Sequence, residues 1–206
     1  MLHMNASNID WDRVHRSNFE AAAFRDINWI SKARGLYESA RKLEPEVVRL
    51  WESYLALMRG EANSSPGDHC QGPYFMLLSF AVENLLKAAA VARNSVRYRA
   101  DFRAMSKFPE ELKKHDLVKL AQFVQLAFSA EEEDLLRRLT RSAVWFGRYP
   151  APLKYAQLSG TQTFVDGKEY SVSWFGSKDI ERLNAFILGL PARVGLDEGC
   201  WQGAAP

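Results

Sequence analysis

A long apolar segment with charges at its centre constrains the fold more than any other part of the sequence. Residues 73–92, PYFMLLSFAVENLLKAAAVA, are about as long as a membrane span, but Glu83, Asn84 and Lys87 lie near the middle. Charged groups are costly at the centre of a lipid bilayer. The segment is therefore predicted to be the buried central helix of a soluble helical bundle, and no membrane partner is expected.

The composition is that of one globular domain over residues 1–206. Hydrophobic residues make up 47% and charged residues 25% of the chain, and the net charge of +2 gives no argument for nucleic-acid binding by the protein as a whole. Cys70 and Cys200 are far apart, so a disulfide framework and a thiolate zinc site are not expected. The N-terminus carries no secretory signal, which favours a cytoplasmic protein. No glycine-rich phosphate loop or metal-binding motif is present, so neither a cofactor nor a metal is expected.

Helical periodicity predicts six helices in this chain. They cover residues 18–43 with a break or kink at Gly35, 44–59 opened by Pro45, 73–94, 117–128, 129 to about 147, and a last one from Ser177 or Asp179 to Leu190. Asp116 is expected to cap one helix, and Ser129 with Glu132 has the spacing of a capping box. Residues 95–111, between two helices, are predicted to form a less regular basic connector.

The spacing of hydrophobic residues changes from helical to strand-like near the C-terminus. TQTFVDGKEYSVSWFG, residues 161–176, holds two short runs of β-branched and aromatic residues around Asp166-Gly167, a pattern typical of a β-hairpin. We expect the hairpin to pack against the helices. The predicted fold is mainly α: an antiparallel helical bundle with a core over about 18–152, a small C-terminal β-hairpin and a final helix over about 153–190, and a loose tail over 191–206.

Polar residues on the central helix and at the next helix start are candidates for a site. Glu83 and Lys87 are four residues apart in the order that favours an ion pair, with Asn84 beside them. The pair is either purely structural or part of a polar notch that lines a groove. His115 precedes the capping residue Asp116 and is a candidate general acid or base, or simply a capping or packing residue.

The stretch RSAVWFGRYPAPLKY, residues 141–155, is the strongest candidate for phosphate binding. Arg141 and Arg148 are predicted to lie two turns apart on one helix face, with Arg137 and Trp145 near the same stripe. Residues 135–165 carry four arginines and Lys154 without any Asp or Glu, and residues 93–107 carry four arginines and one lysine against one acid. Local phosphate recognition needs such basic clusters, although solvated helix faces produce them too.

Three short motifs in the middle of the chain together resemble the HEPN family, named for its higher-eukaryote and prokaryote nucleotide-binding domain. Members carry an E-x-x-L-K helix, an H-D-L-x-x-L helix start and an R-Y-P at the end of a later helix. The matching residues here are Glu83, Leu86 and Lys87, then His115, Asp116, Leu117 and Leu120, then Arg148, Tyr149 and Pro150. The resemblance covers about residues 73–152, and its specificity lies in the order and spacing of the three motifs.

The resemblance implies an antiparallel helical bundle that commonly dimerises, with a polar groove that binds nucleotide or RNA. Many relatives are ribonucleases or toxins of defence and toxin–antitoxin systems, often paired with a nucleotidyltransferase. The catalytic members carry an arginine followed four to six residues later by a histidine. Counting from Arg141, residues 142–148 contain no histidine. Because arginine alone mainly stabilises phosphate charge, the family's usual cleavage reaction is not expected here.

The sequence therefore predicts a HEPN-like protein of stress response or defence that binds RNA or nucleotide phosphates through an arginine-lined groove without robust catalysis. Phosphate binding is assigned to Arg137, Arg141, Arg148 and Tyr149, and the lining of the groove to Glu83, Asn84, Lys87, Asp116 and Trp145. One alternative is a metal-independent ribonuclease or toxin in which His115 acts with Arg148. Another is a non-catalytic homodimeric module that partners a nucleotidyltransferase, a toxin or an antitoxin.

Overall fold

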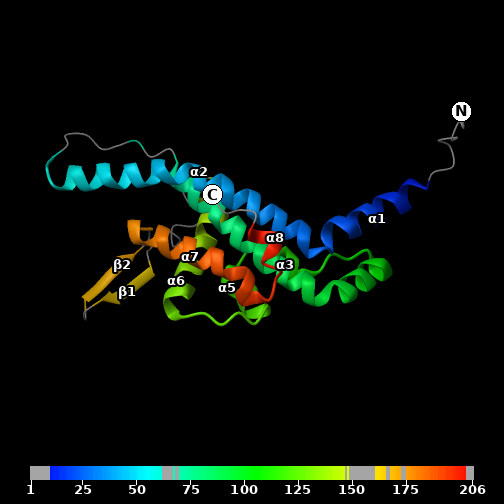
Figure 1. Cartoon of the computed structure of the whole chain (residues 1–206). Coiled ribbons are helices and arrows are strands. Elements are labelled where there is room, and N and C mark those ends of the chain that lie inside the picture. Colours follow the sequence, from blue (N-terminus) through cyan, green and yellow to red (C-terminus); the bar gives the residue numbers. More distant parts are fainter. Residues whose placement is uncertain are drawn as a thin grey trace, which may run out of the picture.

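A computed structural model describes residues 10–61, 67, 70–146, 148, 161–165, 168–172 and 175–202 (Figure 1). The predicted mainly α class is confirmed. The helices are α1 Trp11–Ala23, α2 Asp26–Met58, α3 Gln71–Met105, α4 Glu110–Lys113, α5 Leu117–Phe123, α6 Ala130–Arg141, α7 Ser177–Val194 and α8 Gly199–Gln202, and a π-helical turn, η2, spans Ser142–Phe146. The strands are β1 Thr161–Val165 and β2 Lys168–Val172.

Helix α3 is the centre of the bundle, and its predicted burial is confirmed. Its side chains are buried from Tyr74 to Val91 with few interruptions, and α2, α5, α6, η2 and α7 all pack against it. By length and hydropathy alone α3 would be long enough to cross a membrane, but 72% of its most apolar window is buried inside the protein. The apolar character of this helix therefore serves the protein core.

The predicted bounds of the first helix are wrong, because the chain turns between α1 and α2. Phe24 lies at this turn, is 1% exposed, and packs into an aromatic cluster. The Trp29 indole N–H donates a hydrogen bond of 2.8 Å to the carbonyl of Ala23, which is one of the unpaired carbonyls at the end of α1. The other rings of the cluster are those of Phe19, Tyr98, Phe102 and Phe108.

Neither Gly35 nor Pro45 interrupts α2, so the two helices predicted over 18–59 are wrong on this point. Proline removes one backbone hydrogen bond from a helix interior. Beside it, however, the Glu44 carboxylate accepts hydrogen bonds from the Tyr74 hydroxyl at 3.0 Å and from the Asn184 amide at 3.1 Å. These contacts fix α2 to α3 and α7 where the local sequence is weakest, which explains why the helix continues.

The basic segment predicted as an irregular connector is helical as far as Met105, and its arginines hold neighbouring elements together. Arg93 donates to the carbonyls of Val124 and Val194, at the ends of α5 and α7, and Arg99 donates to the carbonyl of Phe24. Arg97 pairs with Glu111 and Arg103 with Glu20. These four side chains bind groups of the same chain, so they give no support to a phosphate-binding surface on residues 93–105.

Helix α5 begins at its predicted cap but ends five residues earlier than predicted, at Phe123. The Asp116 side chain accepts a hydrogen bond from the backbone N–H of Lys119 at 3.1 Å. At the other end Gln125 has a left-handed backbone with φ 53°, and the N–H of Leu126 bonds to the carbonyl of Ala121 at 2.9 Å. This Schellman arrangement, usually made with glycine, reverses the chain and buries Leu126.

The C-terminal segment predicted as a loose tail is folded over its described part. Helix α7 continues through Pro191 to Val194 and ends at Gly195, whose φ of 74° suits glycine. Trp201 in α8 is then 4% exposed, and its ring lies 5.8 Å from that of Tyr37 in α2. The indole of Trp201, buried against α2, fixes α8 to the bundle.

The two strands pair with each other in antiparallel register. Thr161 faces Val172 and Val165 faces Lys168. Figure 1 shows the pair at the end of the molecule opposite α1. Asp166 and Gly167, the predicted turn, lie outside the described residues.

A buried arginine joins α6 to the start of α7. Arg138 is 5% exposed and binds Asp134 at 2.8 Å and Asp179 at 2.7 Å, while its guanidinium lies 4.8 Å from the centre of the Phe175 ring. The Asp179 carboxylate also accepts the N–H of Gly176 at 2.8 Å. Burial by itself raises the pKa of Asp179, but Arg138 and the Gly176 N–H outweigh burial and hold this pKa below its usual value.

Replacing Asp179 should therefore destabilise the protein in a pH-dependent way. Asp179→Asn is expected to lower the free energy of unfolding by about 3 kcal/mol at neutral pH, because Arg138 remains buried without its main partner. A carboxylate whose pKa is lowered by folding stabilises the protein above its unfolded pKa of about 3.9, and this stabilisation is lost as the pH falls through the folded pKa. Urea denaturation should show the difference between variant and wild type shrinking in acid.

The matched control is Glu133→Gln, which removes the exposed ion pair between Glu133 and Arg137 on the same helix. Its expected cost is below about 0.5 kcal/mol. Equal losses in the two variants would contradict a dominant role for the buried pair.

Candidate polar site on helix α3

The charged pair inside α3 forms as predicted from its spacing. The Lys87 ammonium lies 2.7 Å from the Glu83 carboxylate, and the two residues are 4% and 5% exposed. The Trp29 ring lies beside the ammonium, with 5.8 Å from the nitrogen to the ring centre. Removing two ions from water costs several kcal/mol each, which a close pair offsets only when the remaining hydrogen-bonding atoms also find partners.

His115 supplies such a partner to Glu83. Its Nδ1 lies 3.0 and 3.1 Å from the two carboxylate oxygens, although 32 residues separate the two positions in sequence. In the tautomer that this contact favours, Nδ1 carries the proton and donates to the carboxylate, which leaves the Nε2 lone pair available. The His115 side chain is 62% exposed, so solvent reaches the imidazole while a buried carboxylate fixes its orientation.

A hydrogen bond joins the start of α5, beside His115, to the last turn of α6. The backbone N–H of Leu117 donates to the Thr140 hydroxyl at 3.1 Å, and this hydroxyl donates to the carbonyl of Leu136 at 2.9 Å. Arg141 follows Thr140 directly in the chain. This hydrogen bond therefore joins the segment of His115 to the segment of Arg141.

Arg148 contacts α3 at Phe80, one turn before Glu83. Its guanidinium is 5.1 Å from the centre of the Phe80 ring, and Arg148 itself is exposed. Phe80 precedes Glu83 by three residues, a spacing that places two side chains on one helix face about one turn apart. Asn84 donates its amide to the Phe80 carbonyl at 2.6 Å. The turns from Phe80 to Lys87 thus carry the contacts of both His115 and Arg148.

The other predicted binding residues are placed differently from the prediction. The α-helix ends at Arg141, and η2 then follows with the wider hydrogen-bond spacing of a π-helix, so Arg141 and Arg148 are not two regular turns apart on one α-helical face. Arg141 is half-buried and engaged within the chain, and Arg137 pairs with Glu133 on its own helix. Tyr149 and the side chain of Trp145 lie outside the described residues.

No local sequence pattern indicated the residues that surround the Glu83–Lys87 pair and its neighbouring segments. Trp29, Phe80 and Thr140 resemble ordinary helix residues in the sequence, and their role comes from contacts between distant segments. Arg138 was one of four arginines in a basic run, and only Asp134, four residues earlier, pointed to an ion pair. Within the part of the chain that the structure describes, no group of three or more His, Cys, Asp or Glu side chains could hold a metal ion.

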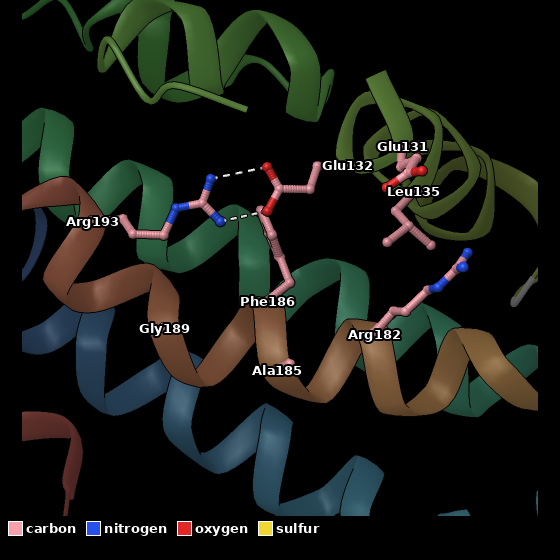
Figure 2. A pocket seen from close by; sticks show the side chains of 8 residues that line it. All are labelled: Glu131, Glu132, Leu135, Arg182, Ala185, Phe186, Gly189 and Arg193. Carbon is pink, nitrogen blue, oxygen red and sulfur yellow. Dashed lines mark hydrogen bonds and ion pairs between the residues drawn. The ribbon is translucent and has the colours of Figure 1, made fainter. Parts of the chain in front are cut away.

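A groove between α6 and α7, with a volume of about 320 Å³, contains none of the predicted site residues (Figure 2). Arg193 closes one end by pairing with Glu132 at 2.6 Å, and Arg182 extends from α7 toward Glu131 and Leu135. The floor is apolar. The lining residues are Glu131, Glu132, Leu135, Arg182, Ala185, Phe186, Gly189 and Arg193.

A mutational cycle should show that Glu83 and Lys87 are energetically coupled. Glu83→Gln is expected to lower the free energy of unfolding by about 3 kcal/mol, because it leaves the Lys87 ammonium buried without a carboxylate. Lys87→Met leaves Glu83 with only His115. The double variant should lose clearly less than the sum of the single losses, since no buried charge remains. Additive losses in urea denaturation would contradict the coupling.

Comparison of the chain with protein-family models, with the sequences of curated proteins and with solved structures yields no match in any of the three. The resemblance to the HEPN family therefore stays a prediction, and a function has to be inferred from the residues themselves.

Proposed function

We propose that the surface formed by Phe80, His115 and Arg148, where the buried Glu83 orients His115, binds the phosphate groups of RNA or of a nucleotide. The observation that carries this proposal is that His115 and Arg148 contact neighbouring turns of one helix, although they come from separate segments. Each presents an exposed, nitrogen-bearing group that hydrogen-bonds phosphate oxygens.

The charge balance of this surface favours an anion. Glu83 and Lys87 neutralise each other inside the protein. Asp116, which follows His115 in the sequence, uses its carboxylate to cap α5, and this carboxylate lies 3.3 Å from the ammonium of Lys119. Among the described residues of this surface, no free carboxylate therefore opposes the exposed guanidinium of Arg148.

The contact between Arg148 and Phe80 also suits a nucleotide. A guanidinium that lies over an aromatic ring is held with its plane available for stacking, and both groups stack on unpaired bases in RNA recognition. The π-helical turn η2, which precedes Arg148, is a geometry found frequently at functional sites. The guanidinium and ring contact supports single-stranded RNA as the ligand class.

RNA binding should depend on Arg148 and on salt concentration. Fluorescence anisotropy with a labelled single-stranded 12-mer, measured at several salt concentrations, gives both the affinity and the salt slope. Arg148→Ala is expected to reduce the slope of log K against log salt by about 0.7 for each phosphate group that the arginine neutralises. Arg182→Ala, which removes an exposed arginine of α7 outside this surface, should leave affinity and slope unchanged.

Two results would contradict the proposal. One is wild-type protein that does not bind RNA, ATP or GTP at low salt. The other is an equal loss of affinity in the Arg148 and Arg182 variants, which would assign binding to the general surface charge of the protein.

Metal-independent RNA cleavage is the second candidate function, favoured by the contact between Glu83 and His115. The Nε2 of His115 would accept the proton of a 2′-hydroxyl as its oxygen attacks phosphorus, while Glu83, through its contact with Nδ1–H, stabilises the imidazolium that forms. The bond from phosphorus to the 5′-oxygen breaks, and that oxygen takes a proton from solvent. Arg148 would stabilise the charge that develops on the phosphate.

Cleavage is tested by incubating the protein with mixed RNA in EDTA. Wild-type protein is expected to cleave, and His115→Gln, an exposed substitution, should lower the rate by about 100-fold or more while leaving RNA binding largely intact. Arg182→Ala is the control, because it removes an exposed charge of α7 outside this surface. Absence of cleavage by the wild type, or cleavage that persists in the His115 variant, would remove this candidate and leave binding alone.

A further inference from the structure

A second groove, with a volume of about 460 Å³, lies beside the C-terminal part of α3. Its lining comes from the last turns of α3, from residues 107–114 and from Phe123 at the end of α5. Pockets that bind small molecules have volumes of this order and combine apolar walls with a few polar groups. The phosphate surface of Phe80, His115 and Arg148 contributes no side chain to this lining, so the groove is a separate feature.

A buried tyrosine hydroxyl without a partner distinguishes this groove. Tyr98 lines it and is 1% exposed, and its hydroxyl has no hydrogen-bond acceptor within the described part of the chain. Buried polar groups in native proteins nearly always have a partner, and an exception calls for an explanation such as a ligand. Three other buried side chains hold an atom without a partner, but none of them lines the groove: Ser79, Arg99 and Trp201.

The hydroxyl of Tyr98 is a donor that can be reached from the groove. Burial raises its pKa, and the Glu111 carboxylate adds to this rise, so the hydroxyl keeps its proton at neutral pH. The guanidinium of Arg97 lies 5.0 Å from the centre of the Tyr98 ring. Because the Arg97 side chain is 53% exposed and its ion pair with Glu111 is of the weak surface kind, it can move aside without disturbing the core.

The charges of the groove favour an anion. Two of its acids are already paired, Glu111 with Arg97 and Glu110 with Lys113, each at 2.8 Å. The other charged side chains of the lining are the exposed Lys107 and Lys114 and the partly exposed Asp101. Two lysines against one aspartate leave an excess of positive charge, which a carboxylate would balance.

The apolar wall of the groove suits a flat ring. Phe108 is partly buried, Phe123 is 38% exposed and Met105 is 63% exposed, and all three line the groove. Aromatic side chains pack against other rings in stacked or edge-on arrangements, and methionine sulfur also makes favourable contacts with rings. An aromatic ligand would therefore cover apolar surface that solvent now reaches.

We propose that this groove binds a small aromatic carboxylate that also carries a hydrogen-bond acceptor. The Tyr98 hydroxyl donates to the acceptor, Lys107 and Lys114 balance the carboxylate, and the ring packs on the apolar wall. The proposal uses no residue of the phosphate surface, so the two proposals can fail separately.

Fluorescence titration with three naphthalene probes tests the proposal. 6-Hydroxy-2-naphthoate carries both the carboxylate and an acceptor oxygen, 2-naphthoate lacks the acceptor, and 2-naphthol lacks the carboxylate. The wild type is expected to bind the hydroxynaphthoate about 5-fold more tightly than naphthoate, the usual effect of one hydrogen bond. Tyr98→Phe should remove this difference and leave the affinity for naphthoate unchanged.

The lysines are tested with the same probes. Lys107→Gln combined with Lys114→Gln should weaken binding of both carboxylates by about 10-fold and leave naphthol binding unchanged, because only the carboxylates carry a charge. The matched control is Lys42→Gln, which removes an exposed lysine of α2 outside the groove and should change none of the affinities.

The thermal stability of Tyr98→Phe gives an independent check. Removing a buried hydroxyl that has no partner should leave the melting temperature unchanged or raise it, whereas removing a bonded hydroxyl lowers it. A lower melting temperature would show that the hydroxyl bonds within the protein and would overturn its role toward a ligand. Failure of all three probes to bind at about 1 mM would overturn the proposal, and so would equal losses in the Lys42 and groove-lysine variants.

Discussion

The structure depends on burying α3 on all sides while it carries two charges. A helix that is surrounded by others can keep Glu83 and Lys87 only if each finds partners, because an unpaired buried ion costs several kcal/mol. The pair satisfies part of this need, and His115 and Trp29 satisfy more of it from the segment before α5 and from α2. The polar pair thus determines which parts of the chain must meet at the middle of the bundle, and the candidate site is formed where they meet.

The arginines of this protein have two roles: some bind groups of neighbouring elements, and Arg148 leaves its donors available to a ligand. The number of arginines in a segment therefore does not predict a phosphate-binding surface. Helix ends leave carbonyl groups without partners, and Arg93 and Arg99 each donate to such a carbonyl from another element. Arg193 donates to the carbonyl of Ala127, between α5 and α6. In residues 93–107, two of the four arginines therefore serve neighbouring helix ends, and the other two, Arg97 and Arg103, pair with acids. Arg148 differs because its described contact is the face of an aromatic ring, which leaves its donors available to a ligand.

Predictions from sequence succeeded where the cause is local. The Asp116 cap, the capping box at Ser129 and the Glu83–Lys87 pair all follow from side chains within four residues of each other, and the structure has all three. Predictions were wrong where distant residues decide. Pro45 suggested a helix start, but contacts to α3 and α7 keep α2 continuous there. The contact of His115 with Glu83 spans 32 residues, so no local pattern could have indicated it.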